Sequence, residues 1–592
     1  MNVNERISRL RKLMKDYGME AYVATDSDPH MSEYAAERWK ARSWISGFTG
    51  SSGIFVATQN ESCLWTDGRY FIQAEKQLAG SGVKLFKMGI PGVPTFAEWI
   101  SDSLKKGDRV GFSAETTSVS VLRDVEKKFE SKGILVCKDR DLVAEIWDGR
   151  PQMPSAKILS HDIKYAGKSS NEKIQSIRNE MKTAGADYYL VGSLDDIAWL
   201  FNIRGGDIPY VPVALAYALI SMTEAFLFIN RAKVPDEAER ILNDNGIKIL
   251  DYEKVEDTLQ TLEEGRSIAL DVKRINCRMY DSIPSRCKII EIDEITAKQK
   301  AIKNDVELEN IRKCLLHDGI AMVKFLCWLD KNIGRQEITE LTVAEKLRLL
   351  RADQPGNLGE SFATIAGYGD HGAMMHYSTS EESRYALENR GLMVLDSGGQ
   401  YLGGTTDITR TVVFDEAGEE EKHDFTMVLK ALISLSSAKF LYGATGSNLD
   451  VLARKPLWDI GLDYKCGTGH GVGYCLSVHE GPQSISPGSN KARLEKGMIV
   501  TIEPGIYREG KYGVRTENMV LVTEDEKTDF GQFMRFETLT LCPISLKGIN
   551  GDMLTAGEKK WLNDYHQKVF DALSPYLDDE EAEWLKINTR KI

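Results

Sequence analysis

Residues 391–414 read GLMVLDSGGQYLGGTTDITRTVVF. An apolar run ends at Asp396, a glycine-rich segment follows, and Asp407 opens a second run rich in Val, Ile and Thr. A strand, a glycine-rich turn and a second strand are typical of a β-hairpin, in which facing side chains lie close together. Two buried carboxylates side by side repel each other, and burying them without cations is costly. The stretch therefore favours a hairpin with a cation site, although each aspartate taken alone could simply cap a turn.

Three further candidate ligands follow along the chain. His470 lies in CGTGHGVG, Glu503 follows the apolar run MIVTI, and Glu517 lies in YGVRTEN just before another apolar run. Carboxylate oxygens and one imidazole nitrogen suit two divalent cations. Four negative carboxylates against two dications also leave room for a bridging hydroxide, which is a nucleophile at neutral pH. The five residues together predict a two-metal hydrolase.

Composition limits the class of protein. The chain has 592 residues, 42% of them hydrophobic and 28% charged, which predicts a globular protein of several domains. Its net charge of −13 argues against nucleic acid and anionic membranes as partners. No apolar run approaches the roughly 20 residues of a membrane span. The nine scattered cysteines and the absence of an apolar leader segment in residues 1–17 favour a cytoplasmic protein with reduced thiols.

The first half of the chain repeats itself. NERISRLRKLMKDYGMEAYVA begins at Asn4, and NEKIQSIRNEMKTAGADYYLV begins at Asn171. Each copy predicts an amphipathic helix that ends at a glycine and leads into a short strand, Ala21–Ala24 or Tyr188–Val191. Duplicated α/β domains are therefore expected over residues 1–160 and 161–304, followed by a third domain. That domain, 305–592, is expected to begin with a helix over 298–332 and to end in a helical tail over 557–592.

Longer motifs resemble a known family. His376 in MMHYS, GTGHGVGYCLSVHEGP, MIVTIEPGIY and GVRTENMVLV resemble, in order and spacing, the long three-domain form of aminopeptidase P. So do SGFTGSSG (46–53), TDGRYFIQA (66–74) and DIAWLFNIRGGDIPYVPV (196–213) in the N-terminal half. The resemblance implies an α/β and α+β multidomain fold, with two creatinase-like domains before a "pita-bread" metallopeptidase domain.

The resemblance also implies roles for individual residues. Asp407 and Glu517 would bridge two metals, Asp396 would chelate one of them, and His470 and Glu503 would hold the other. The metals are usually Mn²⁺ in this family, with Co²⁺, Fe²⁺ or Zn²⁺ as other occupants. The implied catalytic residues are His376, His479 and Glu503, and the residues implied to line the site or contact the substrate are Tyr507, Arg515 and Arg69. Arg515 could equally be a plain ion-pair partner, and the turn at Arg69 could be purely structural.

The implied activity is hydrolysis of the first peptide bond of peptides with proline in second position, by a homodimer. Two alternatives stay open: a prolidase that cuts Xaa-Pro dipeptides, and a peptide-binding module of the same fold without catalysis. The chain departs from the family at Cys466, where members often have a histidine four residues before the metal histidine. A buried cysteine is a small apolar group, so no catalytic role is assigned to it.

Overall fold

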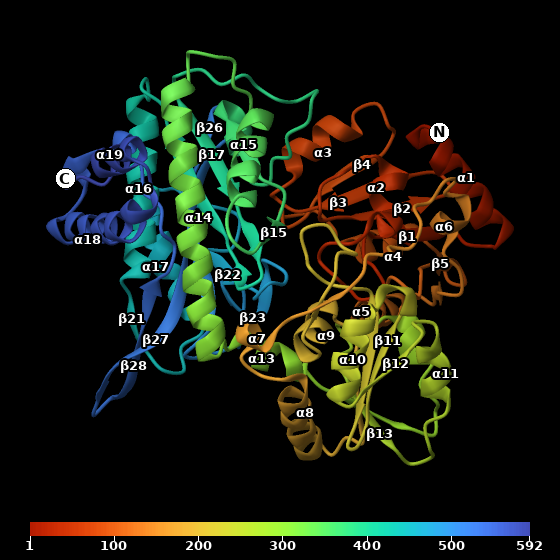
Figure 1. The fold of residues 1–592 in the computed structure, drawn as a ribbon. Coiled ribbons are helices and arrows are strands. Elements are labelled where there is room, and N and C mark those ends of the chain that lie inside the picture. The colour runs from red at the N-terminus through yellow and green to blue at the C-terminus, as the bar shows by residue number, and fades with distance from the viewer. The chain divides into compact units, whose positions relative to one another are not determined.

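The computed structural model describes residues 1–592 and divides into two compact units. The first unit holds residues 1–163 and 168–296, and the second holds residues 164–167 and 297–592. Figure 1 colours the first unit red through yellow-green and most of the second green through blue. The two N-terminal sheets belong to one unit, and the boundary expected between residues 160 and 161 stays a prediction.

The first unit begins with a six-stranded sheet in the order β4-β3-β2-β1-β5-β6. Its strands are β1 Ala21–Ala24, β2 Ile54–Thr58, β3 Ser62–Thr66, β4 Lys84–Lys87, β5 Arg109–Gly111 and β6 Leu135–Cys137. Its helices are α1 Val3–Asp16, α2 Ala41–Ser46, α3 Phe71–Leu78, α4 Phe96–Ser103, α5 Val119–Glu130 and α6 Leu142–Ile146. Strand β1 is antiparallel to β2 and parallel to β5.

The second sheet has the same topology, in the order β12-β11-β10-β8-β13-β14. Its strands are β8 Tyr188–Val191, β10 Ala216–Ser221, β11 Ala225–Ile229, β12 Ile247–Leu250, β13 Ser267–Leu270 and β14 Lys288–Glu291. Its helices are α8 Ser170–Ala184, α9 Leu194–Leu200, α10 Asp236–Asp244, α11 Lys254–Gln260 and α12 Cys277–Asp281. Strand β8 is antiparallel to β10 and parallel to β13, as β1 is to β2 and β5. The matching strand order and directions confirm the predicted duplication.

Local sequence explains why the two repeats start alike. Helix α1 begins with a capping box of Asn2 and Glu5, and α8 begins with one of Ser169 and Glu172. Both helices bury one apolar stripe against the neighbouring sheet. A glycine with positive φ follows each helix and turns the chain into the next strand. The predicted strands β1 and β8 occur with the predicted limits.

The second unit contains a six-stranded sheet, β21-β28-β27-β24-β22-β23, with smaller sheets beside it. Its first strands are β15 Asn357–Glu360, β16 Ile365–Tyr368, β17 Leu392–Ser397, β18 Gly399–Tyr401, β19 Gly404–Thr405 and β20 Ile408–Val413. The later strands are β21 Lys439–Leu441, β22 Gly469–Gly471, β23 Glu480–Ile485, β24 Ile499–Ile502, β25 Gly505–Arg508, β26 Tyr512–Arg515, β27 Asn518–Thr528 and β28 Gly531–Thr538.

Helices pack against these sheets. They are α14 Asp305–Asn332, α15 Glu340–Ala352, α16 Glu419–Ser436, α17 Gly446–Trp458, α18 Ala556–Leu573 and α19 Asp579–Asn588. The main core joins apolar residues of α16, α17 and α18 to the six-stranded sheet. Figure 1 shows α14 running the length of this unit. The expected helical tail is present as α18 and α19. None of the helices combines the length and apolar composition that crossing a bilayer requires.

The pairing of the strands around Asp396 and Asp407 confirms the sequence prediction, with one correction. Strands β17 and β20 are antiparallel neighbours, with Asp396 opposite Thr409. The connection between them is not a plain turn, because it contains β18 and β19, which pair with each other, and β18 also pairs with β15. The glycines of this segment allow the backbone to double back twice, so the two aspartates stay at adjacent strand ends.

The prediction of a single helix over residues 298–332 is wrong. Helix α13, Ile295–Ala301, ends before α14, which starts at Asp305 with a capping box of Asn304 and Glu307. Between them, Ile302 bridges Met498 in a sheet-like contact, and the Lys303 amide donates to the Gly497 carbonyl at 3.0 Å. A long-range backbone contact therefore interrupts a pattern that is helical by local sequence.

A short early segment of the chain belongs to the second unit. Helix α7, Ile163–Ala166, offers backbone carbonyls to three side chains that come much later in the sequence. The Asn304 amide donates to Ala166 and the Asn310 amide to Lys164, each at 3.0 Å, and the Tyr474 hydroxyl donates to Tyr165 at 2.8 Å.

Candidate metal centre

Adjacent strand ends of the second unit carry the five candidate ligands. Asp396 is next to last in β17, and Asp407 immediately precedes β20. His470 is the middle residue of β22. Glu503 directly follows β24, and Glu517 directly precedes β27. Because Ile502 pairs with Asn518 across β24 and β27, the two glutamates lie at the same end of these strands.

The distances show how closely these groups approach. The Nε2 atom of His470 lies 3.3 Å from Oδ2 of Asp407 and 3.6 Å from Oε1 of Glu503. One candidate ligand atom each from Asp407, His470 and Glu517 lie within 4.8 Å of one another. The geometry therefore gathers four of the five residues around one small volume. Asp396 lies beside this volume, because it pairs with Thr409 across β17 and β20 and the Thr409 hydroxyl donates to Glu517.

Glycines on both sides fix the orientation of His470. A Cβ atom at Gly469 would overlap the Thr501 carbonyl, and one at Gly471 would overlap the Glu480 carbonyl. Only glycine fits at either position. The imidazole Nδ1 contacts the Gly471 carbonyl at 2.9 Å and acts as its donor when the ring is neutral. With the proton on Nδ1, the free lone pair of the ring is on Nε2. This atom faces the carboxylates, as a metal ligand requires.

The electrostatics of the centre are those of crowded acids. Burial raises the pKa of Glu517 well above its usual range, and repulsion from Asp407 and Glu503 adds to the rise. Burial and neighbouring carboxylates raise the pKa of Asp396 to about 6, against the opposing effect of Arg515. Burial alone would lower the pKa of His470, but its contact with Asp407 and the charge of Glu503 raise it to about 9. Added positive charge, such as a bound cation, would therefore stabilise the ionised carboxylates of this centre.

One buried atom points to the same conclusion. Oδ1 of Asp396 is inaccessible to solvent and has no hydrogen-bond partner. An unpaired buried carboxylate oxygen is costly, and a divalent cation would satisfy it. The hard oxygen donors and the single imidazole of this centre fit divalent cations.

Arg515 is the protein's own counter-charge in this centre. Its Nη2 contacts Oδ2 of Asp396 at 2.6 Å, and both side chains are almost fully buried. Nη1 donates to the Tyr507 hydroxyl at 2.7 Å and to the Met375 carbonyl at 3.3 Å, and Nε donates to Thr409 at 3.2 Å. Arg515 therefore forms an ion pair, which is one of the two roles considered for it, and its partner is Asp396.

The two further histidines approach the centre from different segments. The ring centroids of His479 and His470 are 4.3 Å apart and the planes are perpendicular. His376 follows Met375, whose carbonyl accepts the hydrogen bond from Arg515. His376 and His479 are both partly exposed. Their catalytic roles stay predictions.

Glu340 holds the turn that carries His376, and sequence analysis missed it. This fully buried carboxylate contacts Nδ1 of His371 at 2.9 Å and accepts from the Tyr377 hydroxyl at 3.0 Å. It also accepts from the Tyr385 amide at 2.9 Å. Glu340 lies 36 positions before His376 in the printed sequence, at the start of α15, where an acidic residue reads simply as a helix-dipole partner.

Thr409 is a second group that sequence analysis missed. Its hydroxyl donates to Oε2 of Glu517 at 2.8 Å and accepts from Nε of Arg515. It orients one candidate metal ligand and the guanidinium together. A threonine inside a strand is so common that nothing in the local sequence distinguishes it.

Cys466 lies on the segment that leads into β22. Its side chain is partly buried and packs beside the main core, and its carbonyl accepts from Nη2 of Arg454 at 2.7 Å. Arg454 is itself buried, and its Nε forms an ion pair with Oδ2 of Asp450 at 2.7 Å. The backbone at Cys466 is thus held independently of the side chain.

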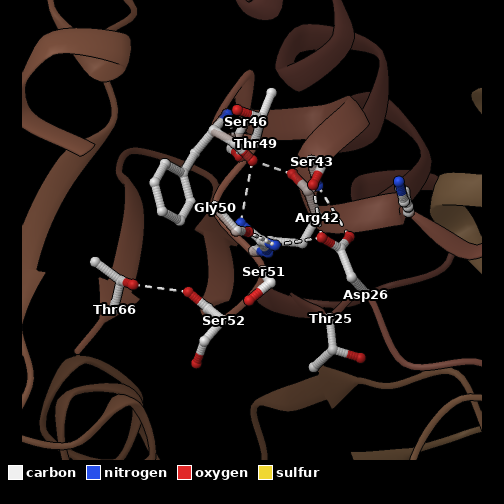
Figure 2. A network of polar contacts seen from close by, with 12 residues as sticks. Thr25, Asp26, Arg42, Ser43, Ser46, Thr49, Gly50, Ser51, Ser52 and Thr66 are labelled. Atoms are coloured by element: carbon white, nitrogen blue, oxygen red, sulfur yellow. Dashed lines mark hydrogen bonds and ion pairs between the residues drawn. The ribbon is translucent and has the colours of Figure 1, made fainter. Parts of the chain in front are cut away.

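The N-terminal motifs form a separate polar network in the first unit. Figure 2 shows the guanidinium of Arg42 at its centre, bonded to Asp26 and to the Gly50 carbonyl. Ser51 and Ser52 follow in this loop and line a cleft of about 320 Å³. Arg42 therefore holds the loop that shapes one wall of the cleft.

Arg69 lies in the same unit and is paired within its own turn. Its Nε and Nη2 contact both oxygens of Asp67 at 2.8 and 2.7 Å. The bidentate hydrogen bonds to Asp67 raise the pKa of Arg69, although burial opposes the rise. This geometry supports the structural interpretation of the turn, and a role for Arg69 toward substrate stays a prediction.

Comparisons with known proteins cover the whole chain. The family model for the creatinase/prolidase N-terminal domain matches residues 6–143, and a second model with the same description matches 149–307. The model for metallopeptidase family M24 matches 309–524, and that for the C-terminal region of peptidase M24 matches 532–592.

Individual relatives are similar over nearly the whole of this chain and most of their own length. Aminopeptidase P2 of Arabidopsis thaliana is 39% identical over 100% of this chain and 89% of its own. A probable Xaa-Pro aminopeptidase P of Laccaria bicolor is 39% identical over 99% of this chain and 93% of its own. The crystal structure of an X-prolyl aminopeptidase from Caenorhabditis elegans, described as a cytosolic enzyme with a di-nuclear active site, superposes with a TM-score of 0.95. It is 33% identical, and the match covers 100% of both chains.

Proposed function

Because this chain belongs to the aminopeptidase P family of the M24 metallopeptidases, we propose that it hydrolyses the first peptide bond of peptides whose second residue is proline. The observation that carries the proposal is that four carboxylates and His470 lie around one small volume at neighbouring strands. The similarity in sequence and in fold extends over all domains of relatives named for this activity.

We propose that the centre holds two divalent cations, with Mn²⁺ as the first choice. The ligands would be Asp396, Asp407, His470, Glu503 and Glu517. When bound, such cations lower the pKa of water to provide a nucleophile at neutral pH, and they stabilise negative charge on the peptide carbonyl oxygen. The unpaired Oδ1 of Asp396 and the raised carboxyl pKa values support occupation by cations.

The protein's own groups then handle protons and position the substrate. Glu503 is partly exposed, with about a fifth of its side chain accessible, so it can take a proton and pass it to the leaving prolyl nitrogen. His376 would donate a hydrogen bond to the negative charge that develops on the scissile carbonyl, and His479 would place the scissile group. A bond to proline is a tertiary amide without an N–H, so recognition must come from shape and from these polar groups.

We further propose a cytoplasmic homodimer. The relative from Caenorhabditis elegans is described as cytosolic, which supports the location. The dimer rests on the family resemblance, and the mass of the particle in solution, measured by light scattering, tests it.

Hydrolysis of a peptide series tests the function. The chelated protein is reloaded with Mn²⁺ and given Xaa-Pro-Yaa, Xaa-Ala-Yaa and Xaa-Pro peptides with the same first residue. Release of the first residue from Xaa-Pro-Yaa alone, or much faster than from the dipeptide, supports the proposal. Rapid cleavage of the dipeptide with none of the tripeptide indicates a prolidase. Failure to take up metal or to cleave any member indicates a binding module.

A further inference from the structure

We propose that Glu480, clamped by Lys300 and Lys303, is a positioning residue for His479. The inference extends the proposed function, because it assumes that His479 acts in the reaction. Glu480 follows His479 directly and opens β23. Lys300 lies in the last turn of α13, and Lys303 lies in the segment that joins α13 to α14, within the stretch expected to form one continuous helix.

The three charged side chains form a closed cluster. Nζ of Lys300 lies 2.9 Å from Oε2 of Glu480, and Nζ of Lys303 contacts Oε1 of the same carboxylate. The exposed fractions of the side chains are 6% for Lys300, 0% for Lys303 and 1% for Glu480. Lys303 also donates to the Lys300 carbonyl at 3.0 Å. With an ammonium on each oxygen, the carboxylate cannot rotate without losing a charged hydrogen bond.

The backbone of Glu480 connects this cluster to the candidate metal centre. Gly471 pairs with Glu480 across β22 and β23, and the Glu480 carbonyl lies so close to Gly471 that no side chain fits there. His470 precedes Gly471, and His479 precedes Glu480. The two imidazole rings meet at 4.3 Å. An anchor on Glu480 therefore fixes the main chain beside both histidines.

Lys303 is itself tied to the strand that leads to Glu503. Ile302 bridges Met498, and the Lys303 amide bonds to Gly497, just before β24. The cluster thus links three segments that converge on the centre. Stability alone does not require charge here, because apolar residues of similar volume often replace a buried ion cluster without loss of stability. The two directed ion pairs instead fix the position of the Glu480 carboxylate.

Activity measurements test the role. Glu480→Gln keeps the shape of the side chain and removes its charge. Steady-state rates on an Xaa-Pro-Yaa tripeptide are measured at saturating Mn²⁺, with metal content determined on the same samples. We expect kcat to fall roughly 10- to 100-fold, the size of effect that follows a displacement of about 1 Å, with KM changed less and two metals retained. Lys430→Met is the control. Lys430 forms an ion pair with Glu558 in the same unit, both side chains are largely buried, and neither is a candidate ligand. It should keep kcat within about twofold.

A double-mutant cycle separates positioning from general stability. In a His479→Ala background, adding Glu480→Gln should lower kcat by less than about threefold, because the imidazole that Glu480 positions is absent. If Glu480→Gln lowers kcat by the same factor in both backgrounds, or leaves kcat within threefold of the parent, the proposal is wrong. The neutral cluster Lys300→Met/Lys303→Met/Glu480→Gln covers the case in which the single variant does not fold. Restored kcat in this folded triple variant also overturns the proposal.

A readout independent of activity separates this inference from the proposed function. Backbone hydrogen exchange is measured for peptides covering residues 470–485. Faster exchange in Glu480→Gln than in the parent and in Lys430→Met supports the anchor even if the protein cleaves no Xaa-Pro peptide. Unchanged exchange overturns the anchor, whatever the peptide assay shows.

Discussion

Arg515 supplies positive charge to the candidate centre when no cation is present, and this leads to a metal-dependent stability effect. Replacing it by Met removes the 2.6 Å contact with Asp396 and the 2.7 Å hydrogen bond to Tyr507, both buried. In the chelated protein, Asp396 then loses its buried counter-charge while three other carboxylates remain beside it. In the loaded protein, bound cations neutralise those charges, so only neutral hydrogen bonds are lost.

The magnitudes differ accordingly. Removing one partner of a buried ion pair costs about 3–5 kcal/mol. Losing the remaining hydrogen bonds in the loaded protein costs about 1–2 kcal/mol. For a unit of roughly 300 residues, with an unfolding entropy of about 2.1 cal/mol/K per residue, these costs lower Tm by about 5–8 °C without metal and by about 2–3 °C with metal.

Calorimetric melting with and without a chelator measures both shifts. Arg508→Met is the control, because Arg508 pairs at 2.5 Å with Asp424, which is fully buried and is not a candidate ligand. Its shift in Tm should be the same under both conditions. An equal shift for Arg515→Met with and without metal would refute the argument that cations and the guanidinium neutralise the same carboxylates.

Other predictions concern pH and single side chains. The folded protein raises the carboxyl pKa of Asp396 to about 6, so it binds more protons than the unfolded chain and, without metal, loses stability as pH rises from about 4 through 6. The pKa of His470, near 9, adds stability that is complete below about pH 6.5 and is lost as pH rises toward 9. The gain in Tm on adding Mn²⁺ should therefore grow between pH 5 and 9; a gain independent of pH would contradict this. His376→Ala should lower kcat by about 10²-fold with both metals retained, measured on a tripeptide, and an unchanged kcat would remove His376 from the reaction. Cys466→Ala should keep metal and most activity, since the backbone there is held through its carbonyl; total loss of activity in a folded, metal-loaded variant would contradict this.

The parts of the fold that sequence predicts are those that local pattern controls. The apolar runs at Leu392 and Ile408, and the capped helices of the two repeats, occur as expected because burial and capping act within a few residues. The fold class follows from the same patterns and from the family resemblance. Within the centre, residue type and position beside apolar runs or glycines selected the five candidate ligands, and their binding of metal stays a prediction.

The parts that sequence did not predict depend on contacts between distant segments. The break between α13 and α14 follows from pairing of residues 302 and 303 with residues 497 and 498. The partner of Arg515 is Asp396, more than one hundred residues earlier, rather than its near neighbour Glu517. Local propensity contains no information about such pairs, so neither Glu340 nor the lysines around Glu480 could be recognised before the fold was known.

The placement of α7 has a consequence for cutting the protein into pieces. A fragment that begins at residue 297 contains every candidate ligand, but it lacks the carbonyls of residues 164–166 that Asn304, Asn310 and Tyr474 use. Tyr474 is only four positions from His470, so this loss reaches the glycine-rich loop of the centre. No single cleavage point separates the two units intact, and a minimal peptidase would have to carry α7 on a linker ahead of its own first helix.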